Sequence, residues 1–238
     1  MTTEPLSDVL GRTAEAVASR IGGLVDDLQA IEAQLAAAVA KMGHVPRRAE
    51  LSFLKPLFED LLVRNGGLID GAGIAYEPGT LADVEYWLDW WRIQATGHPK
   101  FIRHDLNPSS LRYYDYSARD WFRIPRTAGH PVAIGPYIDM GGINVNTVTL
   151  TAPARTVHGT HVLGCDVSLS ALETIFIKAV RTLDPTVILV GPNARIIASN
   201  SPLLVVGTLA DLTKAVVNQP LLPAKYEQLP WNLVVANH

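Results

Sequence analysis

An apolar series with heptad spacing runs through the first forty residues and constrains the fold more than any other feature of the sequence. Its members follow one another at alternating steps of four and three residues: Leu10, Ala14, Val17, Ile21, Leu24, Leu28, Ile31 and Leu35. This repeat places the apolar side chains along one stripe of an α-helix. The sequence therefore predicts a long helix within residues 1–45, which Gly43-His-Val-Pro46 ends. Gly22-Gly23 weakens this helix by about 1 kcal/mol per glycine and marks a bend or a close approach.

The heptad spacing leaves open what this stripe packs against. One interpretation is a helix that packs on its own domain. The other is a helix that also pairs with a second copy of the chain, which would give a homodimer through residues 1–45, because a 3.5-residue repeat favours a helical partner without saying to which chain it belongs.

Beyond the first helix the hydrophobic pattern changes from helical to strand-like. A second amphipathic helix is predicted at residues 47–63, and further helices at 168–183 and 209–217. The other apolar runs are short, rich in β-branched or aromatic residues, and bounded by turn residues. These predicted strands are 71–76, 86–93, 131–137, 147–152, 161–167, 186–190, 194–199 and 231–236. Strands in antiparallel succession with a few helices indicate an α+β fold and not a doubly wound sheet.

Composition excludes several classes of protein. The 238 residues carry 20 Lys and Arg against 23 Asp and Glu, a net charge of -3. A nucleic-acid binder would show a basic stripe, so no nucleic-acid partner is expected. No apolar run approaches the roughly 20 residues of a membrane span, and the first residues lack the pattern of a signal peptide. We therefore expect no membrane insertion and a cytoplasmic location.

The sequence lacks the common enzyme motifs, and no catalysis and no cofactor are predicted. There is no Gly-x-Ser-x-Gly elbow, no Walker loop and no dinucleotide-binding glycine loop. His158 and His161 offer two imidazoles without a third ligand nearby, so no metal site is expected. Cys165 is the single cysteine, and its neighbour Asp166 would raise the pKa of the thiol, which favours a buried structural role.

Aromatic and charged side chains gather between residues 113 and 139, and Asp166 follows later. The members are Tyr114, Arg119, Trp121, Phe122, Tyr137, Asp139 and Asp166. A guanidinium beside an indole and a phenol can bind a carboxylate. Two carboxylates with a phenol can bind an ammonium group. Opposite charges at two ends of one cavity describe a site for a zwitterion.

These residues resemble a known family. The pattern Tyr114-x4-Arg119-x-Trp121-Phe122, then Pro136-Tyr137-x-Asp139 and Gly164-x-Asp166, is similar to the Cache (PDC) sensor domains, and in particular to the amino-acid-binding domains of bacterial chemoreceptors. The resemblance covers residues 68 to 236. It implies that Tyr114, Arg119 and Trp121 hold the ligand carboxylate, and that Tyr137, Asp139 and Asp166 hold its α-amino group.

The resemblance also implies a fold, with three departures from the family pattern. We expect a PAS-like antiparallel sheet of about five or six strands flanked by helices, as one sensor module over residues 46–238 behind the long helix at 1–45. Phe122 stands where the amino-acid binders usually have Tyr. Many relatives have two modules in tandem where this chain is expected to have one. No transmembrane helix or signalling domain flanks the module in this sequence.

Two functional hypotheses follow. The first is a ligand-binding sensor domain whose partner is a small amino acid. The second is a dimeric scaffold that works through the heptad helix, with a vestigial or different pocket for an amine or a carboxylate. Each site residue also has an ordinary structural role, because Tyr114, Trp121 and Phe122 can serve as aromatic core and Arg119 can form a surface ion pair with Asp115 or Asp120.

Overall fold

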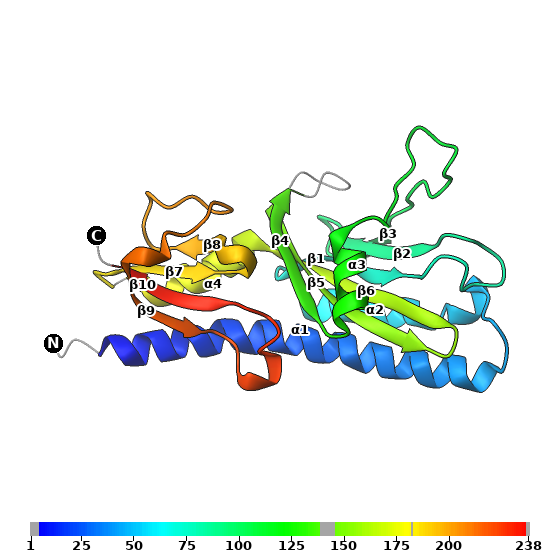
Figure 1. Cartoon of the computed structure of the whole chain (residues 1–238), viewed down its shortest axis with the longest axis horizontal. Helices are drawn as coiled ribbons and strands as arrows, with labels where there is room; N and C mark the ends of the chain where they lie inside the picture. The colour runs from blue at the N-terminus through cyan, green and yellow to red at the C-terminus, as the bar shows by residue number, and fades with distance from the viewer. Residues whose placement is uncertain (1–4, 139–145, 182, 237–238) are drawn as a thin grey trace. The chain divides into compact units, whose positions relative to one another are not determined.

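The computed structural model describes residues 5–138, 146–181 and 183–236 (Figure 1). Its contacts divide the chain into two compact units. The first unit comprises Met1–Gly23, Ala133–Val148 and Val167–His238, and the second comprises Leu24–Val132 and Thr149–Asp166. These units cross the boundary expected between residues 45 and 46, and that division into domains remains a prediction.

The long N-terminal helix is confirmed as α1 (Leu6–Met42), which has 37 residues. Its heptad stripe is buried by the chain itself. The buried members are Leu10, Val17, Ile21, Leu24, Leu28, Ile31 and Leu35. Gly22 marks a close approach, because a Cβ there would lie 2.6 Å from Cε2 of Tyr226, whereas Gly23 faces open space.

The larger sheet is antiparallel, and most of its residues belong to the second unit. After a 3-10 turn, η1 (Arg48–Leu51), helix α2 (Leu54–Arg64) leads into β1 (Ile69–Ala75), β2 (Leu88–Ile93) and β3 (Pro99–Phe101). Helix α3 (Asp120–Ala128) precedes β4 (Val132–Ile138), β5 (Asn146–Thr156) and β6 (Gly159–Ser168). These six strands form one sheet in the order β3-β2-β1-β6-β5-β4. An antiparallel sheet flanked by helices confirms the expected α+β class.

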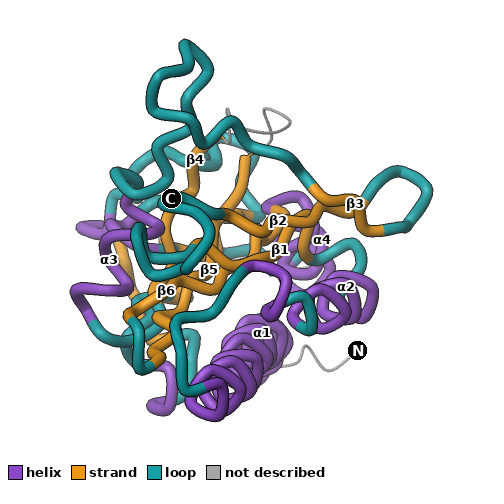
Figure 2. The backbone as a smooth tube through the Cα atoms, turned by 90° about the vertical axis from the view of Figure 1, so that its right-hand side faces the viewer, coloured by secondary structure: helices purple, strands orange, loops and turns teal. Residues whose placement is uncertain are grey.

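Helix α2 packs on β1 and β2, and α3 lies away from it, beside β6 (Figure 2). Successive side chains of a strand point to opposite faces, so Trp90 and Trp91 lie on opposite faces of the sheet. Trp91 stacks on Phe58 of α2, with ring centroids 5.6 Å apart. Trp90 packs instead in a cluster with Phe122 of α3. This face of the sheet, helix α3 and the segment before α3 together carry most of the residues predicted to bind ligand.

The first unit contains a second sheet that the sequence analysis did not anticipate. Helix α4 (Leu169–Val180) contacts β8 (Ile196–Ser199), and the strands follow the order β8-β7-β10-β9. The other members are β7 (Thr186–Val190), β9 (Ala215–Pro220) and β10 (Asn232–Ala236). Between β7 and β8 lies the turn η2 (Pro192–Ala194), and η4 (Ala224–Tyr226) precedes β10. Apolar side chains of β7, β8 and β10 form its core.

The helix predicted at residues 209–217 is wrong. The segment forms one 3-10 turn, η3 (Leu212–Lys214), and then β9. The Asp211 carboxylate accepts hydrogen bonds from Thr213 N at 3.1 Å and from Thr213 Oγ1 at 2.5 Å, which closes a local turn in place of a helix. The β-branched pair Val216-Val217 then extends along β10.

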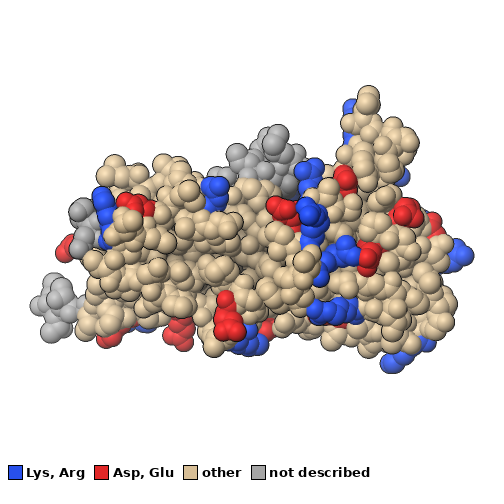
Figure 3. Space-filling model, in the orientation of Figure 1, with Lys and Arg blue, Asp and Glu red and all other residues tan. Residues whose placement is uncertain are grey.

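Charged side chains of both signs lie close to one another on the surface that Figure 3 shows. Lys and Arg side chains gather where α3 lies, with Asp and Glu side chains beside them. Within the described ranges, no helix combines the length and the apolar character that crossing a membrane requires.

Candidate functional site

Three glycines on the face of the sheet beneath α3 make room for the indole of Trp90. A Cβ on Gly73 would lie 2.7 Å from Cε3 of Trp90, and a Cβ on Gly164 would lie 3.3 Å from its Cη2. A Cβ on Gly71 would lie 2.8 Å from its Nε1. The indole of Trp90 therefore spans all three glycines and lies against the strands. Larger residues at Gly71 or Gly73 would displace it.

The side chains of Asp166, on β6, and Trp90 both approach Gly71. Its Oδ2 lies 2.9 Å from the Cβ position of Gly71, so this carboxylate oxygen and the Trp90 indole N–H flank the same point. The other oxygen, Oδ1, accepts a hydrogen bond of 2.8 Å from Thr149 Oγ1 on β5. Asp166 is only 6% exposed. A buried carboxylate held in one orientation is suited to bind a cationic group.

Arg92 is a neighbour that the sequence analysis missed. It stands directly opposite Gly71 in the β1–β2 pairing, on the same face as Trp90. Its Cγ lies 3.5 Å from the Cβ position of Gly71, and the residue is 8% exposed. The two-residue spacing from Trp90 was the available signal, because alternate residues of a strand share a face.

Burial raises the pKa of one acid and of the single thiol in this region. It raises the pKa of Asp70, at the start of β1, while the charge of Arg92 acts in the opposite direction. Burial raises the pKa of Cys165 well above its ordinary value, with a further contribution from Asp166 and then from Asp27. Cys165 is therefore held as a thiol, in agreement with its predicted structural role.

Helix α3 and the segment before it supply the aromatic and basic side chains. Arg119 is the exposed N-cap residue of α3, and its Cζ lies 5.4 Å from the ring centroid of Tyr114. Tyr114 in turn stacks on His104, with ring centroids 4.9 Å apart. The half-buried ring of Trp121 lies 6.1 Å from that of Trp90. Three of the predicted residues, Tyr114, Arg119 and Trp121, thus join the aromatic cluster around Trp90.

Phe122 lies inside this cluster. Its side chain is fully buried, with its ring 5.2 Å from that of Tyr116, and the guanidinium of Arg126 lies 4.8 Å from its centroid. The structure gives Phe122 a packing role. Its contact with a ligand remains a prediction.

The two other predicted residues belong to a different part of the chain. Tyr137 lies half-buried on β4 in the first unit, with its Cδ1 3.1 Å from the Cβ position of Gly135. Asp139 lies outside the described residues. The second unit therefore brings together five of the seven predicted residues: Tyr114, Arg119, Trp121, Phe122 and Asp166.

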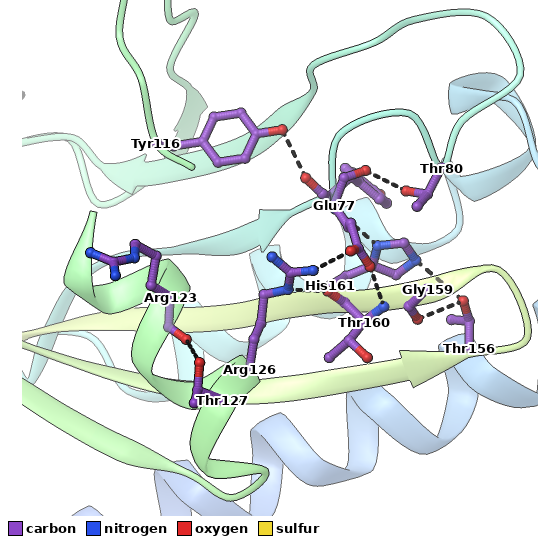
Figure 4. A network of polar contacts seen from close by, with 11 residues as sticks. Glu77, Thr80, Tyr116, Arg123, Arg126, Thr127, Thr156, Gly159, Thr160 and His161 are labelled. Atoms are coloured by element: carbon purple, nitrogen blue, oxygen red, sulfur yellow. Dashed lines mark hydrogen bonds and ion pairs between the residues drawn. The ribbon is translucent and has the colours of Figure 1, made fainter. Parts of the chain in front are cut away.

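His161, half of the imidazole pair noted in the sequence, belongs to a separate polar network (Figure 4). Its Nδ1 accepts a hydrogen bond of 3.2 Å from Glu77 N. Burial lowers the pKa of His161 to about 4. No group of three or more His, Cys, Asp or Glu side chains suited to a metal occurs in the parts of the chain that the structure covers.

The long helix, the six-stranded sheet and the second four-stranded sheet together define the fold of the Cache-type sensory ligand-binding domains. No protein-family model matches the chain, and no curated protein matches it. Solved structures match it over nearly its whole length, and they confirm the resemblance at the level of the fold.

Among these structures is the ligand-binding domain of the Campylobacter jejuni chemoreceptor Tlp3 in complex with L-valine. It is 12% identical, with a TM-score of 0.65, and the match covers 97% of this chain and 90% of that one. The ligand-binding domain of the Pseudomonas aeruginosa PAO1 amino acid chemoreceptor PctC in complex with GABA is 18% identical, with a TM-score of 0.62 and coverage of 98% and 97%. The extracellular domain of the putative histidine kinase soHK1S-Z6 is 18% identical, with a TM-score of 0.62 and coverage of 98% and 93%.

Proposed function

We propose that this chain is a sensor domain that binds a small amino acid through its ammonium and carboxylate groups and catalyses no reaction. The observation that carries the proposal is the convergence of the Asp166 carboxylate and the Trp90 indole N–H at Gly71. An acceptor and a donor side by side suit a small molecule with charges of both signs.

In this proposal Asp166 binds the ligand ammonium. Its Oδ1 accepts a hydrogen bond from Thr149, which orients the carboxylate, and its Oδ2 lies toward Gly71. By the resemblance, Tyr137 and Asp139 are the further candidates for binding the ammonium group. Both ligand charges lose water on binding, so a ligand without an amino group forgoes the charge-assisted hydrogen bonds at this end, at a cost of roughly 1–3 kcal/mol.

The ligand carboxylate is assigned to the other cluster. Arg119 supplies a fork of N–H donors, Trp121 one indole N–H and Tyr114 a hydroxyl. Arg119 lies over the Tyr114 ring, which favours one arrangement of its guanidinium. Ligands of the solved structures that share the fold, L-valine with Tlp3 and GABA with PctC, also carry an amino group and a carboxylate, and they support this assignment.

The absence of catalysis is part of the proposal. Cys165, the single thiol, is buried and its pKa is raised, so it is a poor nucleophile. His161 has its Nδ1 engaged by a backbone N–H and is buried away from solvent. Neither group is positioned for general acid–base or nucleophilic chemistry.

A ligand screen tests the function. The melting temperature of the purified chain is measured with the common amino acids, with amines and with short carboxylates, and each hit is titrated by calorimetry. We expect at least one amino acid to raise the melting temperature, and neither its amine nor its carboxylate analogue to do so. Asp166→Asn should lose that response, while Asp184→Asn, an acid outside the site, should keep it. A chain that binds no amino acid, or an Asp166→Asn variant with wild-type affinity, would overturn the proposal.

The alternative scaffold function has less support. The heptad stripe that suggested a helical partner is buried by the chain's own residues. A homodimer through α1 would therefore use the other, polar side of the helix, and sedimentation of the purified chain measures its oligomeric state. The cytoplasmic location likewise remains a prediction, and the match to soHK1S-Z6 is to an extracellular domain.

A further inference from the structure

Helix α3 carries part of the proposed ligand site but is too short to hold its own position. It has nine residues, with Arg119 as N-cap, Trp121 in its first turn and Pro125 inside. Helices of this length are unstable in isolation, and an internal proline removes one helical hydrogen bond. The placement of Arg119 and Trp121 therefore depends on contacts between α3 and the sheet.

Arg126 makes those contacts at the last turn of α3 (Figure 4). Its Nε donates a hydrogen bond of 2.9 Å to the carbonyl oxygen of Thr160 on β6. Its Nη2 forms an ion pair with Oε1 of Glu77, at the end of β1. The two side chains are 26% and 30% exposed, so solvent screens this pair less than a surface ion pair.

Glu77 is itself held in place from several directions. Its Oε2 accepts a hydrogen bond of 2.8 Å from Thr160 N, and its carbonyl oxygen accepts one of 2.5 Å from Thr80 Oγ1. The Glu77 backbone N–H donates to His161. A Cβ on Gly159 would lie only 2.6 Å from Oε2, so the glycine leaves room for the carboxylate. The acceptor for Arg126 is thus held by β6 and by the turn at Thr80, without help from α3.

The anchor also touches the aromatic residues of the site. The Arg126 guanidinium lies 4.8 Å from the ring centroid of Phe122, within the range of a cation–π contact. Phe122 meets the ring of Trp121 edge to face, at 6.1 Å. A continuous set of contacts therefore joins the Arg126–Glu77 pair to Trp121.

We infer that Arg126 is a positioning residue of the ligand site, which acts with Glu77 to fix α3 so that Arg119 and Trp121 lie over the sheet face that carries Asp166. This inference rests on the proposed function, because it assigns Arg126 an effect on ligand affinity without contact to the ligand. Displacing a binding group by about 1 Å can cost a large part of its contribution.

The test compares two arginines of the same helix. Arg126→Met removes the anchor and keeps the aliphatic stem, whereas Arg123→Met changes an exposed arginine whose side chain points away from the network (Figure 4). Hydrogen exchange of the α3 amides and calorimetric affinity for the amino acid found in the screen are measured for both. We expect Arg126→Met to speed exchange in α3 about tenfold or more and to raise Kd about tenfold, with exchange in α4 and β7 unchanged. Arg123→Met should match the wild type in both measurements.

Two further variants separate positioning from general stability. Arg126→Lys keeps the positive charge but loses the planar guanidinium group and its several N–H donors. Its Kd should therefore lie between those of Arg126→Met and the wild type. Glu77→Gln removes the ion pair from the other side and should change α3 exchange and Kd in the same direction as Arg126→Met. Wild-type α3 exchange in both Arg126→Met and Glu77→Gln would overturn the inference. So would faster α3 exchange with an unchanged Kd.

If the wild-type chain binds no amino acid, the proposed function fails and the role in ligand affinity fails with it. The α3 exchange of Arg126→Met then still decides whether the anchor holds the helix. If Arg126→Met does not fold, Arg126→Lys and Glu77→Gln carry the same comparison.

Discussion

Asp166 on β6 accepts a 2.8 Å hydrogen bond from Thr149 on the neighbouring strand β5, and both side chains are buried. The bond occupies one carboxylate oxygen and fixes the direction of the other. Orientation is thus supplied by the sheet before any ligand is present, which reduces the entropy that binding must overcome.

Thr149→Val should weaken ligand binding while leaving the charge of Asp166 in place. The variant removes the hydroxyl donor but keeps the branched shape, so the carboxylate loses one charge-assisted hydrogen bond of roughly 1.5–3 kcal/mol. We expect a Kd about tenfold higher by calorimetry, with a larger loss for Asp166→Asn. Equal affinity of Thr149→Val and the wild type would show that the bond has no role in recognition.

Gly71→Ala should reduce affinity without unfolding the chain. The added methyl would lie 2.9 Å from Asp166 Oδ2 and 2.8 Å from Trp90 Nε1, so one or both side chains must shift. The expected result is a loss of the ligand-dependent rise in melting temperature, with an unchanged circular dichroism spectrum. Gly11→Ala in α1, where a Cβ meets nothing within 4 Å, is the matched control and should keep the ligand response. Wild-type binding by Gly71→Ala would remove Gly71 from the site.

Substitution of the adjacent glycines Gly22 and Gly23 of α1 by alanine should change the free energy of unfolding in opposite directions. Gly23→Ala adds a methyl in open space and should stabilise the helix by about 1 kcal/mol. Gly22→Ala would place a Cβ 2.6 Å from the ring of Tyr226, and this clash should offset the helical gain or exceed it. Thermal and urea unfolding of the two variants measure the difference. A similar gain for both would mean that the ring of Tyr226 does not pack on α1 at Gly22.

Protonation of His161 should destabilise the fold in mild acid. Burial lowers the pKa of His161 from 6.5 to about 4, so the unfolded chain binds this proton more readily than the folded one. The free energy of unfolding therefore keeps its full value above pH 6.5. It declines as the pH falls from 6.5 toward 4, by ~3 kcal/mol at most. His161→Asn keeps an acceptor for Glu77 N without titrating in this range. Urea unfolding at pH 7, 6, 5 and 4.5 should give a steeper loss for the wild type, and parallel curves would contradict the assignment.

The sequence predicted those elements in which local pattern and tertiary packing agree. The heptad stripe from Leu10 to Leu35 gave α1 and its buried side, because the same residues satisfy the helical period and the core. It could not tell that the partner of this stripe belongs to the same chain. At Asp211 the local turn overrode the helical spacing of Leu209, Leu212 and Val216, which is a choice that periodicity alone does not register.

The proposed site combines residues that the sequence could indicate with others that it could not. Tyr114, Arg119, Trp121 and Asp166 were predicted from their order along the chain, and their contact with a ligand remains a prediction. Arg92 and Trp90 reach the same place only through the pairing of β2 with β1, which no local pattern specifies. Helix α3 was missed because nine residues with a proline inside give too short a helical signal, although its C-terminal contacts with Glu77 and Thr160 hold it firmly.

The glycines under Trp90 limit how the binding preference of this protein can change over evolutionary time. Every other amino acid carries a Cβ, so a substitution at Gly71 or Gly73 can only take space away from that side of the site. Descendants that accept bulkier ligands must instead replace Trp90 or Trp121 by a smaller residue, or change the rotamer of one of them. Selection for a wider range of ligands should therefore leave its marks on the tryptophans and spare the backbone beneath them.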